Sequence, residues 1–376
     1  AKDLASSVQP IAPPRRRKAQ PMRPTDCTLR LYAAASPAYR GLRMIESLSI
    51  ERCRGISSGQ LSQLTQLCIL LGTNGSGKST VLDALHIAAS AQPGQAVGES
   101  VRRRDVLRGA RWLFFRGDDK TPARLTIHAA QGERRLDLTL QPLRRGQFVS
   151  QISIDGAQGG GPVHSVKFKA NNDFEPSDAP AAFPGGSSLA PIDVRFVDLR
   201  DGQHRNALLR AHTAAVEEGT LSQITPLLAD VIPGLKDFRL VTDEKTEPVV
   251  MLDFGNRAVP AALAGDGAYA LIRLAFELAS KREPLVLLEE PEIHQHPASL
   301  RRTAQLIRAA VDRGTQVVLS THSLDLFDFL VSDATPDQLN KISVYRLNLR
   351  EGRLLNSRWL GTEIPHGRED AVRDLR

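Results

Sequence analysis

The sequence has 376 residues, enough for two or three domains, and its 41% hydrophobic content is typical of a globular protein with a sizeable core. No stretch approaches the roughly 18 consecutive apolar residues of a membrane-spanning helix, and the first residues lack the apolar segment of a signal peptide. The three cysteines form no C-x-x-C pair, which argues against a disulfide framework or a zinc site. We expect a cytoplasmic protein without a membrane partner.

The net charge of +7 is concentrated at the start of the chain. Residues 1–43 contain nine Lys or Arg and two Asp, so the remaining residues carry 40 charges of each sign. This arm is rich in Pro and Arg and poor in large apolar residues, which predicts a disordered segment. It could bind nucleic acid or an acidic partner, or it could be an idle extension before Met44, where "MIESLSIERCRGI" reads as the first strand of a domain.

The strongest motif is "LCILLGTNGSGKSTVLDAL", residues 67–85. A short apolar run predicts a strand buried on both faces, and apolar residues at helical spacing follow the glycine-rich loop. The loop fits G-x-x-x-x-G-K-[ST], in which backbone N–H groups surround phosphates, the lysine reaches the terminal phosphates and the hydroxyl holds Mg²⁺. We therefore predict binding of a nucleoside triphosphate with Mg²⁺ by Gly72, Asn74, Gly75, Ser76, Gly77, Lys78, Ser79 and Thr80, with Ser79 as a metal ligand.

Residues 93–262 are predicted to form an insert within a head that spans residues 44–376. Alternating apolar residues on both sides of Gln131 and Gly132 predict a β-hairpin, and Leu221 begins a helical pattern that Pro233 stops. Two stretches rich in Gly, Pro, Ser and Ala, at 154–162 and 176–191, are typical of loops. The insert has no sustained heptads, which argues against a long coiled coil.

Two further apolar strands are expected to end in polar residues. "EPLVLLEEPEIHQHP" places Glu289 and Glu290 after a buried strand, where one carboxylate can hold Mg²⁺ and the other can accept a proton from water. After an amphipathic helix over residues 300–311, "TQVVLSTHS" places His322 at the end of a third strand. Ligands of open α/β sheets gather at such ends, so we expect His322 to contact a γ-phosphate.

Together, "GTNGSGKST", "LAGDGAYALIRLAFELA", "LLEEPEIHQHP" and "VVLSTHS" resemble the ABC-type ATPases of the RecF and overcoming-lysogenization-defect (OLD) group, also called AAA-family ATPases. The resemblance covers about residues 44–376. It implies an α/β P-loop NTPase fold of the ABC head type, with a β-rich lobe and a helical segment that carries a signature motif. It also implies a homodimer or higher oligomer in which two heads enclose two ATP molecules.

The resemblance assigns roles to individual residues. It implies phosphate and Mg²⁺ binding by Lys78 and Ser79, a metal role for Glu289, water activation by Glu290, and γ-phosphate sensing by His322. The signature of the opposite subunit would correspond to Gly265, Asp266 and Gly267, and residues 292–297 would form a crossing loop at the dimer interface. This loop also accounts for His294 and His296, which could otherwise suggest a metal site.

The sequence departs from the family pattern at three places. Glu289 stands where Asp is usual, which predicts slow hydrolysis. The signature segment lacks the usual Ser, although backbone N–H groups at a helix start still bind phosphate. No glutamine can be assigned to the family's Q-loop.

Two uses of ATP as a conformational switch remain open. The first is a defence or toxin-like module whose head controls a separate effector, such as a nuclease, because the roughly 50 residues after His322 are too few for the Toprim nuclease of the OLD family. The second is a DNA-repair ATPase of the RecF type, which binds DNA itself. Outside residues 1–43 the positive and negative charges are equal in number, which favours the first use. Nucleic acid stays a candidate partner.

Overall fold

The computed structural model describes residues 44–143, 146–156, 164–177, 189–200, 204–242, 248–279 and 284–364. The expected arm at residues 1–43 and most of the two loop stretches lie outside the described residues. No helix in the described part of the chain is both long and apolar enough to span a bilayer.

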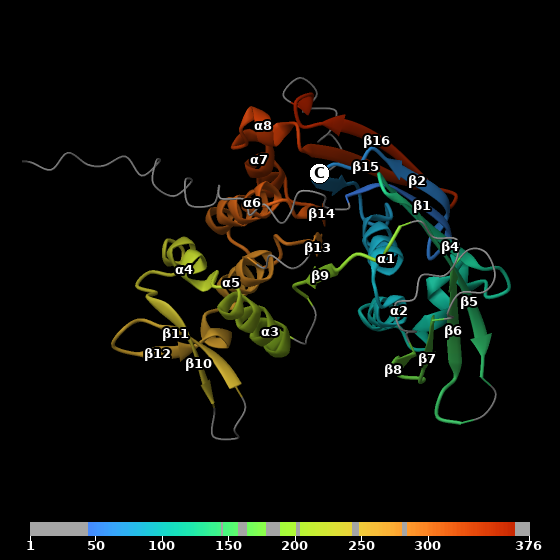
Figure 1. The fold of residues 1–376 in the computed structure, drawn as a ribbon, viewed down its shortest axis with the longest axis horizontal. Helices are drawn as coiled ribbons and strands as arrows, with labels where there is room; N and C mark the ends of the chain where they lie inside the picture. The colour runs from blue at the N-terminus through green and yellow to red at the C-terminus, as the bar shows by residue number, and fades with distance from the viewer. Residues whose placement is uncertain are drawn as a thin grey trace, which may run out of the picture.

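A twisted sheet of 13 described strands runs through the molecule in the order β8-β7-β6-β5-β4-β1-β2-β16-β15-β3-β14-β13-β9 (Figure 1). Its parallel part lies at one end of this order, where strand β3 pairs with β15 on one side and β14 on the other. The parallel strands are β3 (Leu67–Leu71), β9 (Val194–Asp198), β13 (Leu285–Glu289), β14 (Gln316–Ser320) and β15 (Ile342–Arg350).

Strands β3, β13 and β14 are largely apolar because both of their faces are covered. In β3, Cys68 and Leu70 belong to one hydrophobic core, whereas Leu67, Ile69 and Leu71 belong to the other. Successive side chains of a strand point to opposite faces, so a strand between two cores needs an unbroken apolar run. The first core contains α1 (Lys78–Ala89) and α2 (Pro93–Arg102), and the second contains α5 (Asp266–Ala279), α6 (Pro297–Asp312) and α7 (Leu324–Ser332).

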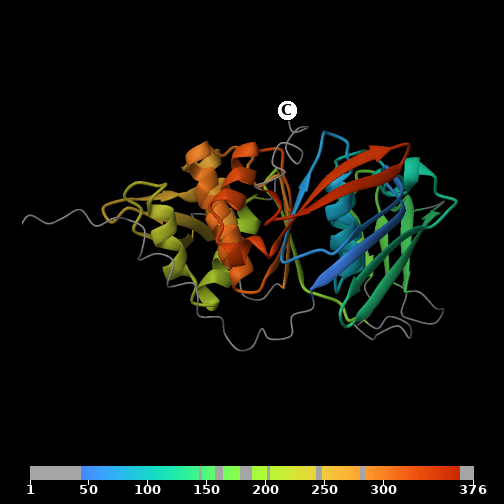
Figure 2. The ribbon, with the colours of Figure 1, turned by 90° about the horizontal axis from the view of Figure 1, so that it is seen from above.

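The antiparallel part of the sheet curves around α1 and α2 (Figure 2). The predicted hairpin is confirmed as β4 and β5, and its two-residue turn lies at Ala130 and Gln131, one position earlier than expected. Strands β4 to β8 continue the sheet outward from β1, although the predicted division at residues 93–262 stays a prediction. The elements here are β1 (Ile45–Cys53), β2 (Ile56–Ser62), β4 (Ala123–Ala129), β5 (Gly132–Pro142), β6 (Ser150–Gly156), β7 (His164–Phe168), β8 (Phe174–Ser177), β16 (Arg353–Leu360) and the 3₁₀ turns Gly109–Leu113 and Phe115–Gly117.

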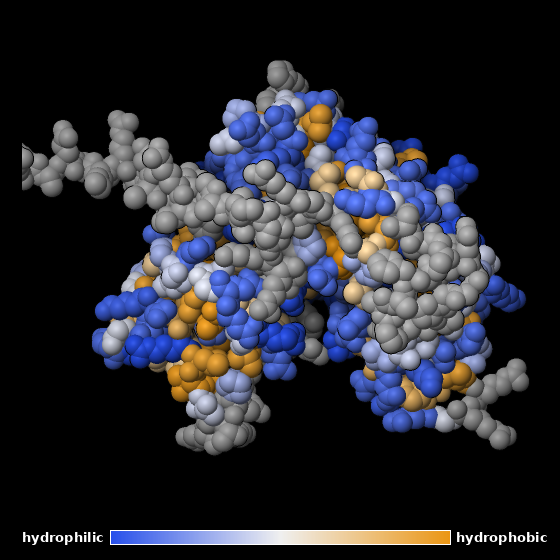
Figure 3. All heavy atoms as spheres, viewed as in Figure 1, coloured by the Kyte–Doolittle hydropathy of each residue, from blue (hydrophilic) through white to orange (hydrophobic). Residues whose placement is uncertain are grey.

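The opposite side of the molecule is largely helical and carries a separate three-stranded sheet. The predicted helix from Leu221 is confirmed as α4 and ends at Ala229, before Pro233. An apolar patch lies over the small sheet, where Leu240 and Val241 of β10 are about half exposed, at 49% and 46% (Figure 3). The remaining elements are α3 (His204–Glu217), α4 (Leu221–Ala229), β10 (Asp237–Thr242), β11 (Pro248–Asp253), β12 (Ala258–Pro260), the 3₁₀ turn Ala261–Leu263 and α8 (Pro336–Leu339).

One buried side chain connects the two parts of the large sheet. Gln316, at the start of β14, accepts a hydrogen bond from the N–H of Ile45 at 2.9 Å and donates to the Ile45 carbonyl at 2.8 Å. It also donates to the carbonyl of Thr65, just before β3. These bonds satisfy backbone groups that would otherwise be buried without a partner, and they hold β1 beside the parallel strands.

Candidate functional site

The glycine-rich loop forms a tight turn between β3 and α1. Gly72, Gly75 and Gly77 all have positive φ, at 142°, 78° and 98°, which other residues rarely adopt. A side chain at Gly72 would begin 2.5 Å from the carbonyl oxygen of Leu347, so the strand behind the loop leaves no space for one. The backbone therefore curls in the way that an anion-binding loop requires.

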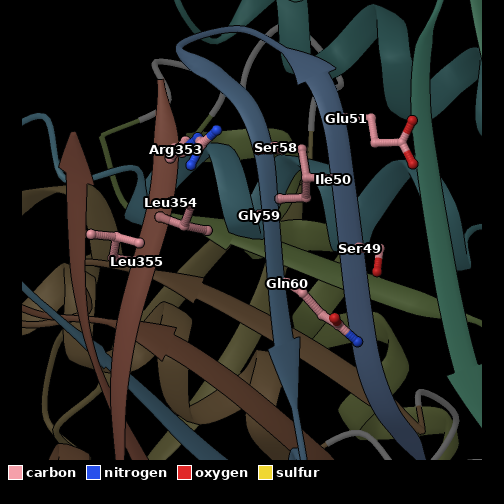
Figure 4. Close-up of a pocket in the computed structure, with 9 residues that line it drawn as sticks. All are labelled: Ser49, Ile50, Glu51, Ser58, Gly59, Gln60, Arg353, Leu354 and Leu355. Carbon is pink, nitrogen blue, oxygen red and sulfur yellow. The ribbon is translucent and has the colours of Figure 1, made fainter. Parts of the chain in front are cut away.

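The floor of the loop is supported by the strands behind it. A side chain at Gly77 would meet Leu354 of β16 at 3.2 Å and Ile56 of β2 at 3.4 Å. Figure 4 shows Leu354 projecting from β16 toward Gly59 of β2, beside a shallow hollow of about 390 Å³ where β16 diverges from β2. None of the described P-loop residues lines this hollow, and Leu354 is the side chain that it shares with the floor of the loop.

Lys78 and Ser76 show that the loop suits a triphosphate. The buried Lys78 Nζ donates to the carbonyls of Gly72 and Thr73 at 2.7 and 3.1 Å, and the buried Ser76 Oγ has no hydrogen-bond partner. Burial lowers the pKa of Lys78, and the charge of Glu290 is the main opposing influence. A phosphate could accept from both side chains, so the loop has the donors that the predicted ligand needs.

The acidic and histidine residues meet at the same edge of the sheet, as the sequence predicts. Glu289 on β13 is in register with Ser320 on β14, which in turn pairs with Leu70 of β3. The chain turns sharply after Glu289, because Glu290 has a positive φ of 46°. This turn leaves Glu290 Oε1 3.8 Å from His322 Nε2.

His322 and Glu292 are also linked directly. The backbone N–H of His322 donates to Glu292 Oε1 at 2.7 Å, while Glu292 Oε2 is buried without a partner. Burial raises the pKa of Glu292 and lowers the pKa of His322, and the charge of Lys78 adds to the second effect. His322 is therefore held as a neutral imidazole near the lysine, in a position from which it can donate to an oxyanion.

Glu289, the predicted metal residue, is held by two arginines that the sequence analysis did not single out. Its fully buried carboxylate lies 2.9 Å from Arg200 Nη2 and 3.1 Å from Arg104 Nη1. Arg200 also approaches Glu290 at 3.6 Å. Glu289 fits a metal-binding role only if these guanidinium groups move away, because they form ion pairs with the carboxylate oxygens that would coordinate Mg²⁺.

Arg104 extends this network to the helix that follows the P-loop. Asp83, on α1, has a fully buried side chain and lies 3.1 Å from Arg54, 2.7 Å from Arg103 and 3.1 Å from Arg104. Burial alone would raise the pKa of Asp83, but the three arginines hold it well below its usual value. A single network of charges thus connects α1, the end of α2 and the end of β13.

Some signals for this network are visible in the sequence. Asp83 interrupts the apolar pattern of the helix after the P-loop, and three consecutive arginines, Arg102 to Arg104, follow at the end of the next helix and just after it. Arg200 comes two residues after β9, a strand that was not predicted because the run "VRFVD" is short and contains two charges. β9 pairs in parallel with β13, so Asp198 lies beside Glu289.

The expected signature residues lie at the start of α5. Gly265 has a positive φ of 84°, and no heavy atom lies within 4 Å of the position where its side chain would begin. A side chain at Gly267 would instead begin 2.6 Å from the carbonyl oxygen of His294. The structure therefore brings Gly267 to the predicted crossing loop of its own chain and leaves Gly265 open.

A protein-family comparison agrees with this architecture. The family model described as "AAA domain, putative AbiEii toxin, Type IV TA system" matches residues 67–158 and 205–328, which is more than half of the chain. The chain belongs to this family. The expected fold class, an α/β P-loop NTPase of the ABC head type, is confirmed. The narrower assignment to the RecF and OLD group stays a prediction.

Individual proteins are similar to this chain either over a short stretch or at low sequence identity. A curated relative, uncharacterized protein MJECL11 from Methanocaldococcus jannaschii, is 30% identical over 115 residues, which are 30% of this chain and 91% of the relative. A Smc head bound to the C-winged helix domain of ScpA has a TM-score of 0.49 and 15% identity, covering 84% of this chain and 97% of that chain. The Smc head domain from Thermotoga maritima has a TM-score of 0.43 and 14% identity, covering 83% and 98%.

We predict that Asp83→Asn strongly destabilises the protein, because it removes the shared counter-charge of three arginines in a buried place. The expected loss in the free energy of unfolding is about 3 to 5 kcal/mol, measured by chemical denaturation. Asp312→Asn is the matched control, because Asp312 pairs with Lys341 at 3.1 Å where both side chains are about one-third exposed. The control should lose less than about 1 kcal/mol. Equal losses would contradict a special role for Asp83.

Proposed function

We propose that this chain binds and hydrolyses ATP and uses the hydrolysis cycle to open and close a dimer of heads. The observation that carries the proposal is the meeting of the P-loop, Glu290 and His322 at one edge of the sheet. Phosphoryl transfer to water needs little more than such positioning, a base and stabilisation of the developing charge.

In the proposed reaction, Lys78 exchanges its two backbone carbonyls for oxygens of the β- and γ-phosphates. Glu290 accepts a proton from a water molecule as that water attacks the γ-phosphorus, and the bond to the bridging oxygen of ADP breaks. His322, held neutral by its surroundings, donates to a γ-phosphate oxygen. Mg²⁺, held by Ser79 and by Glu289 once the arginines release it, would neutralise phosphate charge.

We further propose that the switch belongs to a defence or toxin-like system and controls a separate effector protein. The family description supports this setting, because it names a toxin and a toxin-antitoxin system. The surface supports a protein partner, since Leu240 and Val241, neighbours on β10, are about half exposed. Exposed apolar residues that gather on one part of a surface are typical of contact sites.

A DNA-binding repair ATPase of the RecF type is the second candidate function. It is favoured by an exposed basic and aromatic segment after α2, in which Arg108, Arg111 and Arg116 are exposed. Arg111 lies 5.4 Å from the centre of the Trp112 ring, and Trp112 is itself 47% exposed. Arginines that contact phosphates beside an aromatic ring that stacks on bases are a common way to bind single strands. The formal charges outside residues 1–43 sum to zero, so the net charge of this part of the chain does not favour DNA binding.

The DNA alternative predicts that a fluorescent single-stranded oligonucleotide binds with an affinity that falls steeply with salt. The variant Arg108→Glu with Arg111→Glu should weaken that binding by at least about tenfold, because each change replaces a phosphate contact with a repulsion. Arg350→Glu, an exposed arginine on β15, is the matched control. If fluorescence anisotropy shows no difference among the three proteins, this segment does not bind DNA.

For the catalytic assignment, we predict that Glu290→Gln retains ATP binding and loses about 10²-fold or more in turnover, because the amide cannot accept the proton. Lys78→Ala should instead weaken nucleotide binding. Glu351→Gln, an exposed glutamate at the β15–β16 turn, is the matched control and should hydrolyse normally. Phosphate release and nucleotide binding are the two measurements. Normal turnover by Glu290→Gln would exclude Glu290 as the base.

For the dimeric site, we predict that Lys78→Ala and Gly265→Arg are each inactive alone and recover part of the activity when mixed. The first lacks a phosphate anchor and the second blocks the signature offered to the partner, so a mixed dimer has one site with both defects and one with neither. Gly219→Arg is the matched control for strain, because Gly219 also has a positive φ, of 67°, and open space around it. It should be active. Stable mixed dimers without activity would contradict this arrangement.

A further inference from the structure

A second cavity lies away from the P-loop, near the far end of α1. It has a volume of about 410 Å³ and is lined by residues of α1, α2, β9, α3 and α5, which face one another across the middle of the molecule (Figure 1). Twelve of its 16 lining residues are polar or charged. Its size falls within the range of small-molecule sites, and its lining excludes a mainly apolar ligand.

Two buried nitrogen atoms on the wall of this cavity have no hydrogen-bond partner. They are His86 Nδ1 and Arg103 Nε, and both residues line the cavity. His86 is only 6% exposed. Burial lowers the pKa of His86 to about 3, and the charge of Arg103 contributes, so the imidazole is neutral. The His86 Nε2 faces Glu99 Oε2 at 3.9 Å, so Nδ1 of the neutral ring is an acceptor, whereas Arg103 Nε is a donor. A buried polar atom without a partner is costly, which indicates that these atoms are placed for a ligand.

Phe196 of β9 fixes the positions of these two groups. The Arg103 guanidinium lies 3.7 Å from the centre of the Phe196 ring, and the His86 ring lies 5.3 Å from it. Because Phe196 already contacts both side chains, it offers little free surface for stacking on a nucleobase. The ligand should therefore be a small polar molecule without a large aromatic part.

The balance of charge in the cavity favours an anion. Five arginines and three carboxylates line it. The carboxylates have local cations, since Glu277 lies 3.5 Å from Arg195 and Asp198 lies 3.3 Å from Arg200. Arg210 on α3 is exposed at the rim. Guanidinium groups bind phosphate oxygens with strong, charge-assisted hydrogen bonds.

We propose that this cavity binds a small polar organic phosphate of the sugar-phosphate class, with the phosphate between the arginines and a sugar hydroxyl donating to the unpartnered nitrogen of His86. The cavity also adjoins both arginines that hold Glu289. Arg103 in its wall precedes Arg104, and Asp198 in its wall lies two residues before Arg200. A bound phosphate would draw Arg103 and the end of β9 toward the cavity, and the chain would pass this movement to the adjacent Arg104 and Arg200, so its binding changes how firmly Glu289 is held. This second step rests on the proposed ATPase function.

Binding is tested with ribose 5-phosphate and inorganic phosphate as probes, by calorimetry on the full chain with its P-loop filled by a non-hydrolysable ATP analogue and Mg²⁺. We expect saturable binding of at least one probe, no binding of neutral ribose, and retained binding in Lys78→Ala. Arg210→Glu should weaken the binding by at least about tenfold, because it reverses a rim charge, whereas Arg350→Glu should not. The proposal is wrong if neither probe binds, or if Arg210→Glu binds as tightly as the wild type.

The coupling is tested separately by measuring ATP turnover with and without a saturating concentration of the probe that binds. We expect turnover by the wild type to change by at least about twofold. Turnover by Arg210→Glu should match the wild type without the probe and should not respond to it. A probe that binds without changing turnover would leave the site in place and refute the coupling. Absence of any hydrolysis would refute the proposed function and leave the binding result unaffected.

Discussion

The fully buried carboxylate of Asp83 is the constraint on which the geometry of the site depends. It lies on the helix that begins at the P-loop lysine, and its three arginine partners come from the β1–β2 turn and the end of α2. Removing a charge from water is expensive unless close partners compensate for it. Any shift of α1 relative to these segments would leave a charge without its partner, so the P-loop helix is held in one position.

The same network decides how the acidic edge of the sheet is held. Arg104 contacts both Asp83 and Glu289, and Arg200 contacts both Glu289 and Glu290. Glu289 is thus neutralised by guanidinium groups in the place where the family resemblance puts a metal ion. Replacement of the two guanidinium groups by Mg²⁺ at this buried carboxylate would change the net charge little and the geometry greatly. Under the proposed function, binding of Mg²⁺ with ATP would release both arginines, and these belong to two different segments of the chain.

This arrangement gives a physical reason for the site to act as a switch. The end of α2 meets Glu289 and also lines the second cavity, and β9, which lines the same cavity, leads directly to Arg200 at Glu289. Under the proposed coupling, a change at Glu289 would alter the surroundings of the cavity, and a change in the cavity would alter the surroundings of Glu289. Such reciprocity is required of any two sites whose binding energies are coupled. The coupling needs no long pathway, because Arg103 and Arg104 are neighbours in the chain.

The sequence by itself determined the features that are local in the chain. The P-loop is contiguous, with its strand, glycines, lysine and helix in one stretch, so its conformation and ligand class follow from spacing. The strands that end at Glu289 and before His322 were equally readable, because a strand buried on both faces must be apolar throughout. Parallel strands end at the same edge, and this placed Glu290 near His322 before the fold was known.

The tertiary structure alone decided which charges meet. Arg104 and Glu289 are 185 positions apart, and no sequence pattern around either residue indicates that the other is its partner. β9 was missed because its charged residues hide a strand that becomes clear only through pairing with β13. The contact of Gly267 with the His294 backbone likewise depends on how α5 packs. Periodicity records which face of an element is buried, whereas ion pairs between distant segments depend on the packing that brings them together, and a single sequence holds no record of that packing.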